Sequence, residues 1–122
     1  MAQSMVAVVD DDEGIRNALE SLLRSFGHRV GTWGSGEDFL TDPRGLDAVC
    51  VITDLQMPGM DGLDLQRRLL ERSHVPGVIM MTAYPRRTAE VQALAAGAVR
   101  FLTKPFEAET LEESVRAVLC AR

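Results

Sequence analysis

Four groups of polar residues, each directly after a short apolar run, have side chains that can do chemistry. Asp10-Asp11-Asp12-Glu13 follows the first run, and Asp54 ends the third. Thr82-Ala83 ends the fourth run, and Thr103-Lys104-Pro105-Phe106 follows the fifth. Together they offer carboxylates, a hydroxyl and an ammonium. This set suits the transfer of a phosphoryl group to a carboxylate nucleophile.

The five apolar runs are of strand length and alternate with helical patterns. The runs cover residues 5–9, 30–33, 48–52, 78–81 and 99–102, and several are dense in valine and isoleucine. Ile15, Leu19, Leu22 and Phe26 keep the spacing of one buried helix face. Further helices are expected near residues 35–40, 61–72, 89–96 and 107–119. This alternation predicts an α/β fold, with a parallel sheet covered by helices on both faces.

In such a doubly wound sheet the carboxyl ends of all strands lie on one edge, and ligands bind there at the switch point in strand order. In the order 2-1-3-4-5 this point lies between strands one and three, so Asp10 and Asp11 are expected beside Asp54. Several carboxylates in one small site repel one another and need a cation or a raised pKa. Hard oxygen ligands favour Mg²⁺, or Mn²⁺ in its place.

Composition limits the possible functions. A chain of 122 residues with 46% apolar content fits one domain with its own core. A net charge of −5 argues against direct contact with nucleic acid, and no apolar run is long enough to span a membrane. Residues 1–5 lack the features of a signal peptide, so a cytoplasmic protein is expected. Cys50, Cys120, His28 and His74 form neither a disulfide framework nor a metal-ligand pattern, and are expected to be core, loop or surface residues.

Each polar group also has an ordinary explanation. Asp12, Glu13 and Asp61 are expected to cap helices or to interact with the helix dipole. Thr82 alone would be a common strand end, and Lys104 alone a solvated surface charge. It is the joint occurrence of all four groups at strand ends that favours a shared site.

These residues and their order resemble the receiver domains of two-component response regulators. The resemblance rests on residues 8–11 (VVDD), 53–62 (TDLQMPGMDG), 81–83 (MTA), 97–98 (GA) and 104–106 (KPF). It covers nearly the whole chain, so residues 1–122 are identified as one receiver domain with the flavodoxin-like, CheY-like (βα)5 fold. The chain is most similar to the FixJ-like group, whose members usually carry a C-terminal helix-turn-helix DNA-binding domain. It is expected to be either a single-domain regulator or part of such a longer protein.

The resemblance implies a role for each matching residue. Asp54 would accept a phosphoryl group from a phosphohistidine on a sensor histidine kinase. Asp10, Asp11 and Asp54 would hold the metal ion, with the backbone carbonyl of Gln56 as a further ligand. Thr82 and Lys104 would each contact a phosphoryl oxygen. A cis peptide bond between Lys104 and Pro105 would aim the lysine inward.

The resemblance also implies a conformational switch. Thr82 would move toward the phosphoryl group, and Phe101, where the family more commonly has Tyr, would turn into the vacated space. The alternative is that Phe101 is a plain core aromatic. The change would reach residues 85–120, the face through which relatives dimerise or contact an output domain. Gln56 and Tyr84 would flank the water that hydrolyses the phosphoryl group. Bulky Tyr84 is expected to slow that step, unless it is only a loop aromatic.

Two other classes of protein use related residues. A phosphatase of the haloacid dehalogenase kind also combines a strand-end Asp, Mg²⁺, Thr and Lys, but its nucleophile belongs to a D-x-D motif after the first strand. Residues 10–12 formally contain that motif, whereas residues 54–56 do not, and the chain has no cap domain. A flavodoxin-like binder would need a phosphate-cradling loop after strand one, where the acidic residues would repel phosphate. The favoured prediction is a phosphorylation-controlled signalling module, not an enzyme.

Overall fold

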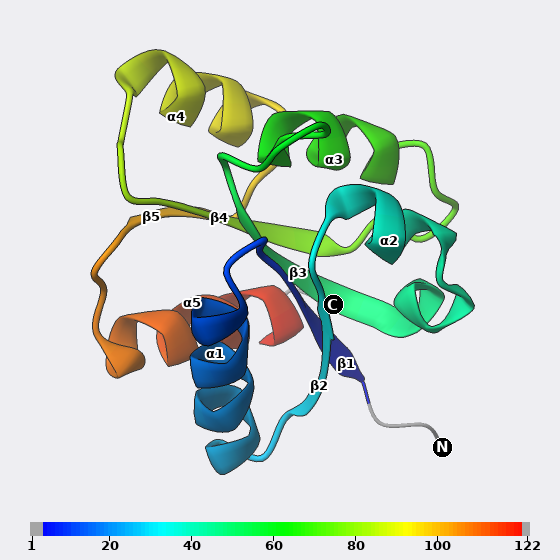
Figure 1. Cartoon of the computed structure of the whole chain (residues 1–122), viewed down its shortest axis with the longest axis vertical. Coiled ribbons are helices and arrows are strands. Elements are labelled where there is room, and N and C mark those ends of the chain that lie inside the picture. Colours follow the sequence, from blue (N-terminus) through cyan, green and yellow to red (C-terminus); the bar gives the residue numbers. More distant parts are fainter. Residues whose placement is uncertain (1–3, 121–122) are drawn as a thin grey trace.

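The computed structural model describes residues 4–120 and has a central sheet of five parallel strands in the order β2-β1-β3-β4-β5 (Figure 1). The strands are β1 (Met5–Val9), β2 (Arg29–Trp33), β3 (Ala48–Asp54), β4 (Gly77–Thr82) and β5 (Arg100–Thr103). The helices are α1 (Glu13–Ser25), α2 (Gly36–Thr41), a short 3-10 helix η1 (Pro43–Asp47), α3 (Gly62–Leu69), α4 (Arg87–Ala95) and α5 (Ala108–Cys120). The predicted fold class and strand order are confirmed.

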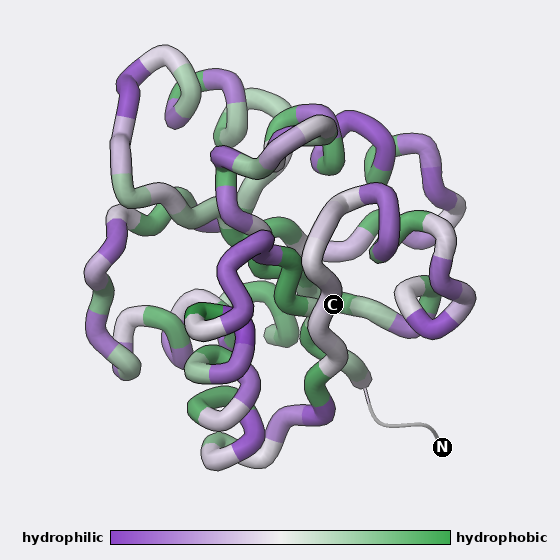
Figure 2. Tube along the Cα trace, in the orientation of Figure 1, coloured by the Kyte–Doolittle hydropathy of each residue, from purple (hydrophilic) through white to green (hydrophobic). Residues whose placement is uncertain are grey.

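The helices form two layers, one on each face of the sheet. Figure 1 shows α1 and α5 on one face and α2, α3 and α4 on the other. Successive residues of β1 point to opposite faces, so Ala7 and Val9 join the core under α2–α4, whereas Val6 and Val8 join the core under α1 and α5. Figure 2 shows that hydrophobic residues, in green, gather at the centre of the molecule, where the strands lie. Burial on both faces explains why the strand sequences are continuous apolar runs.

Polar side chains fix the starts of two helices that lead away from the sheet edge. The Asp12 carboxylate accepts a hydrogen bond from Ile15 N (3.1 Å) at the start of α1. Asp61 accepts one from Asp64 N (2.8 Å) at the start of α3, as part of a capping box. The predicted capping roles of Asp12 and Asp61 are confirmed.

Two helix boundaries differ from the prediction. The α3 helix ends at Leu69 rather than near residue 72, because the amides of Glu71 and Arg72 bond to carbonyls three residues back and tighten the chain into a turn. The fixed φ of a proline favours the first turn of a helix, but Pro85 lies before α4, which begins at Arg87. The first helical hydrogen bond there runs from Glu90 N to the carbonyl of Arg86, which is the N-cap residue.

The residues expected to be chemically unimportant mostly have structural roles. Cys50 is buried in β3, and burial raises the pKa of its thiol to about 12, so it is an unreactive core residue. His28 lies in the turn after α1, where its Nε2 is 2.7 Å from Glu112 Oε1 of α5 and both side chains are largely covered. No pattern in the sequence indicates this contact. Within residues 4–120, no helix has both the length and the apolar character needed to cross a membrane.

Candidate functional site

Strand pairing brings the predicted site residues to one edge of the sheet. Val9 of β1 pairs with Thr53 of β3, so the residues that follow, Asp10 and Asp54, lie side by side. Lys104 follows β5 next to β4, and its amide donates to the carbonyl of Thr82 (2.8 Å). Asp10, Asp54 and Thr82 are all buried. The structure therefore groups these residues as the parallel sheet predicted.

Three carboxylates form a cluster at the switch point. Asp10, Asp11 and Asp54 each offer one oxygen, and these oxygens lie within 4.8 Å of one another. Asp10 and Asp54 are buried, whereas Asp11 is exposed, so the cluster opens to solvent on the Asp11 side. A few hard oxygen ligands beside a solvent-accessible opening fit a divalent cation that keeps part of its water shell.

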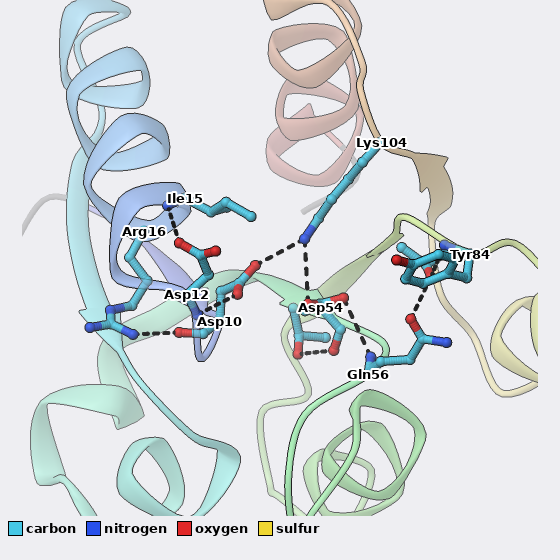
Figure 3. Close-up of polar contacts among 10 residues, drawn as sticks. Asp10, Asp12, Ile15, Arg16, Asp54, Gln56, Tyr84 and Lys104 are labelled. Carbon is cyan, nitrogen blue, oxygen red and sulfur yellow. Dashed lines mark hydrogen bonds and ion pairs between the residues drawn. The ribbon is translucent and has the colours of Figure 1, made fainter.

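Lys104 brings a positive charge to the same place. Its Nζ lies 3.2 Å from Asp10 Oδ2 and 3.4 Å from Asp54 Oδ2, and Figure 3 shows it reaching between the two carboxylates. The peptide bond between Lys104 and Pro105 is cis. Lys104 is the only lysine of the sequence, which has twelve arginines. The positive group between the two carboxylates is therefore a compact ammonium and not the wider, planar guanidinium.

The environment of Asp54 makes it harder to ionise than an ordinary aspartate. Burial raises the pKa of Asp54 above its usual value of 3.8, and the charge of Asp10 acts in the same direction. The charge of Lys104 and a hydrogen bond from Gln56 N (3.3 Å) lower this pKa and oppose the first two effects. Lys104 therefore favours the carboxylate form, which is the nucleophilic one.

The Thr82 hydroxyl is held by the two loops that follow β3 and β4. It accepts a hydrogen bond from Tyr84 N (3.0 Å) and donates to Gln56 Oε1 at the longer distance of 3.4 Å. The Tyr84 side chain is 71% exposed. Gln56 and Tyr84, the two residues predicted to tune dephosphorylation, thus both contact Thr82. Their effect on hydrolysis stays a prediction.

Phe101 lies on β5 opposite Met80 of β4 and packs, partly buried, against the core under α2–α4. This position suits either of its predicted roles, as a switch residue or as a core aromatic. Its role as a switch stays a prediction.

The loop after β3 folds back closely over Asp54. Gly62 N donates to the carbonyl of Leu55 (2.9 Å), and a Cβ atom at Gly62 would lie only 2.6 Å from the Asp54 carbonyl oxygen. Gly59 in the same loop has a φ of 73°, which side-chain-bearing residues rarely adopt. The glycines after Asp54 are therefore requirements of the backbone at this site.

One contact at the site was not predicted from the sequence. Arg16, in the first turn of α1, turns back so that its Nη1 donates to the carbonyl oxygen of Asp10 at 2.7 Å (Figure 3). A signal was available, since helical side chains lean toward the helix N-terminus. An arginine one turn into a helix can therefore reach the strand end that precedes it.

Comparison with known proteins agrees with this geometry. The family model of the response regulator receiver domain matches residues 6–116. The response regulator protein TmoT of Ectopseudomonas mendocina is 40% identical over 117 residues, which are 96% of this chain and 53% of that protein. The transcriptional regulatory protein FixJ of Azorhizobium caulinodans is 40% identical over 114 residues, or 93% and 54% of the two chains. The chain thus spans about half the length of these curated relatives.

Solved structures give the same result. The response regulator StyR superposes with a TM-score of 0.89 at 38% identity, covering 98% of this chain and 61% of that one. FixJ-N superposes with a TM-score of 0.84 at 33% identity, covering 97% and 94%. The sheet order, the strand-end carboxylates and the match over residues 6–116 support one conclusion. The chain belongs to the receiver domain family of two-component response regulators.

Proposed function

We propose that Asp54 is the phosphoacceptor of a switch that a sensor histidine kinase turns on and that controls transcription. The observation that carries the proposal is the position of Asp54, a buried carboxylate with the acidic pair on one side and Lys104 on the other. Family membership supports signalling through a two-component system. A relative named a transcriptional regulatory protein supports the output.

In the proposed transfer, a carboxylate oxygen of Asp54 attacks the phosphorus of a phosphohistidine. A P–O bond to Asp54 forms while the P–N bond breaks, and the electron pair leaves with the imidazole nitrogen. Such a transfer depends mainly on positioning and on neutralising charge. Lys104 is suited to both tasks, because its ammonium already lies 3.4 Å from the Asp54 carboxylate.

Asp10, Asp11 and Asp54 would hold the Mg²⁺ or Mn²⁺ ion, and the backbone carbonyl of Gln56 is the further ligand that we propose. When bound, the ion neutralises charge on the transferring phosphoryl oxygens. The Asp10 carboxylate is already oriented for this role, since Asp12 N donates to one of its oxygens (2.9 Å) and Lys104 contacts the other.

The proposed switch begins at Thr82. Rotation of its hydroxyl toward a phosphoryl oxygen would break the long contact with Gln56 and pull on the loop that leads to α4. Phe101 would then turn further into the core. The α4 helix is suited to respond, because Ala93 is its one buried residue and its N-cap makes no side-chain hydrogen bond. The face formed by α4, β5 and α5 would change, and with it dimerisation or contact with a DNA-binding output domain.

A beryllofluoride experiment tests the switch. The BeF3-activated receiver domain of DrrB is 31% identical to this chain with a TM-score of 0.86, covering 97% of this chain and 98% of that one. Hydrogen exchange of this chain in MgCl2 should change in α4, β5 and α5 when beryllofluoride is added, and should stay constant in α2. Asp54→Asn is the control and should not respond. Unchanged exchange across α4, β5 and α5 in the wild type would contradict the switch.

We further infer that the domain is a stoichiometric phosphoacceptor and not an enzyme acting on external phosphate esters. The support is that the carboxylate cluster and Lys104 lie at the carboxyl ends of the strands, and that among residues 4–120 no second domain covers them. Incubation with a generic phosphomonoester should therefore release phosphate no faster than the aspartyl phosphate on Asp54 hydrolyses. Release much faster than that hydrolysis, lost in Asp54→Asn, would instead support the phosphatase alternative.

A further inference from the structure

Arg16 contacts the backbone that joins two of the proposed metal ligands. Its Nη1 donates to the carbonyl oxygen of Asp10 at 2.7 Å. This oxygen belongs to the peptide unit between Asp10 and Asp11, and a peptide unit is planar. The guanidinium therefore helps to fix the orientation of the peptide plane between Asp10 and Asp11.

The two aspartates differ in how else they are held. Asp10 is fully buried, its amide donates to the carbonyl of Trp33 (3.1 Å), and its carboxylate contacts Lys104. Asp11 is exposed, and within residues 4–120 the structure records no hydrogen bond or ion pair to its side chain. The direction of the Asp11 carboxylate thus depends on its backbone. That backbone is held before Asp11 by the contact of Arg16 with the Asp10 carbonyl, and after Asp11 by the hydrogen bond from Asp12 N to the Asp10 carboxylate.

The Arg16 guanidinium also lies close to the backbone of Gly34. A Cβ atom at Gly34, just after β2, would lie 3.3 Å from Arg16 Nη1 and 3.7 Å from its Cζ. The guanidinium therefore rests against bare backbone on one side and the Asp10 carbonyl on the other. The end of β1, the first turn of α1 and the residue after β2 all meet at this one side chain. An arginine needed only for solubility would extend into water.

We propose that Arg16 is a positioning residue of the metal site, which orients the Asp10–Asp11 peptide so that both carboxylates face the cation and Asp54. The inference rests on the proposed function, because it assigns Arg16 to the same site. Lysine would keep the charge but not the planar donor group that fits between Gly34 and the carbonyl.

Calorimetric titration of MgCl2 into the full chain tests the proposal. Arg16→Gln should raise the Kd for Mg²⁺ about tenfold or more, the range found when residues that orient metal ligands are removed. Arg16→Lys should lose less affinity. Arg24→Gln is the matched control, because Arg24 lies on the same helix and also donates to a backbone carbonyl, that of Val30 (3.3 Å), away from the acidic cluster. It should bind Mg²⁺ like the wild type.

Thermal unfolding in EDTA separates positioning from stability. If Arg16→Gln lowers the Tm in EDTA but leaves the Kd for Mg²⁺ of the folded protein unchanged, Arg16 is merely structural and the proposal is overturned. If Arg16→Gln does not fold, Arg16→Lys decides, because it keeps the positive charge but lacks the planar donor group. Weaker binding by that variant supports the proposal, and wild-type binding overturns it. If the wild type itself binds no Mg²⁺, it is the proposed function that fails.

Discussion

The ammonium of Lys104 lies 3.4 Å from the carboxylate of Asp54, although the two residues are 50 positions apart in the chain. The same ammonium lies 3.2 Å from Asp10. One ammonium group thus forms ion pairs with two buried carboxylates at the ends of neighbouring strands. Removing any one of the three charges changes the free energy of keeping the other two ionised.

Lys104→Met should destabilise the metal-free protein, because two carboxylates then share the site without a cation. The expected loss is on the order of 2 kcal/mol in the free energy of unfolding, measured by urea denaturation in EDTA. Saturating MgCl2 should remove most of this difference, since a divalent ion replaces the missing positive charge. A deficit of the same size with and without Mg²⁺ would show that the methionine disturbs packing instead.

Asp54→Asn should stabilise the metal-free protein at neutral pH. Burial and Asp10 raise the pKa of Asp54 above 3.8 in the folded state, so ionisation of this residue disfavours folding. The wild type loses stability relative to the variant as the pH rises from about 3.8 through the folded-state pKa, and the difference is then constant. Thermal unfolding in EDTA from pH 3 to pH 8 measures this, with a Tm advantage of roughly a few degrees expected at pH 7.

Asp47→Asn is the control for this pH series, because Asp47 is an exposed carboxylate at the end of η1, next to the start of β3, whereas Asp54 ends that strand. It should follow the wild type across the range. An Asp54→Asn curve that also followed the wild type at every pH would contradict the electrostatic account of the site.

Tyr84→Ala should shorten the half-life of the aspartyl phosphate, if the ring hinders the attacking water. Tyr84→Phe should keep the wild-type half-life, because the expected effect depends on bulk and not on the hydroxyl. Both are measured by following loss of the phosphoryl adduct after the phosphodonor is removed. An unchanged half-life in Tyr84→Ala would identify Tyr84 as only a loop aromatic, in keeping with its 71% exposure.

Gln66→Met should loosen α4 with little change in global stability. Gln66 is 2% exposed, its Nε2 donates from α3 to the carbonyl of Ala93 in α4 (3.0 Å), and its Oε1 has no hydrogen-bond partner. Methionine loses the hydrogen bond but also removes a buried unpaired oxygen, so the net change should stay within about 1 kcal/mol. Hydrogen exchange of the backbone amides in α4 should become roughly several-fold faster, while exchange in α1 stays constant. A loss of several kcal/mol would contradict this balance.

The fold and the grouping of the site residues could be predicted because both follow from local patterns. Apolar runs separated by amphipathic segments specify a parallel sheet, and a parallel sheet brings Asp10, Asp54 and Lys104 to one edge. The roles assigned to Thr82 and Phe101 came from the family resemblance, since neither residue type is distinctive by itself.

The contacts that were missed depend on how helices pack and where long side chains point. His28 meets Glu112, and Gln66 meets the carbonyl of Ala93, only because helices distant in sequence are placed side by side. Arg16 lies near Asp10 in sequence, but its contact depends on the rotamer that fits over Gly34. Hydrophobic periodicity contains no information about any of these three polar contacts.

The most direct test of the central claim is an intact-mass spectrum after incubation with acetyl phosphate, with and without Mg²⁺, beside Asp54→Asn. The proposed function predicts a single phosphoryl adduct that needs Mg²⁺ and is absent in Asp54→Asn. Such a result would establish Asp54 as the acceptor and support the acidic pair as the metal site. No adduct under any of these conditions, or an equal adduct in Asp54→Asn, would contradict the proposed phosphorylation switch.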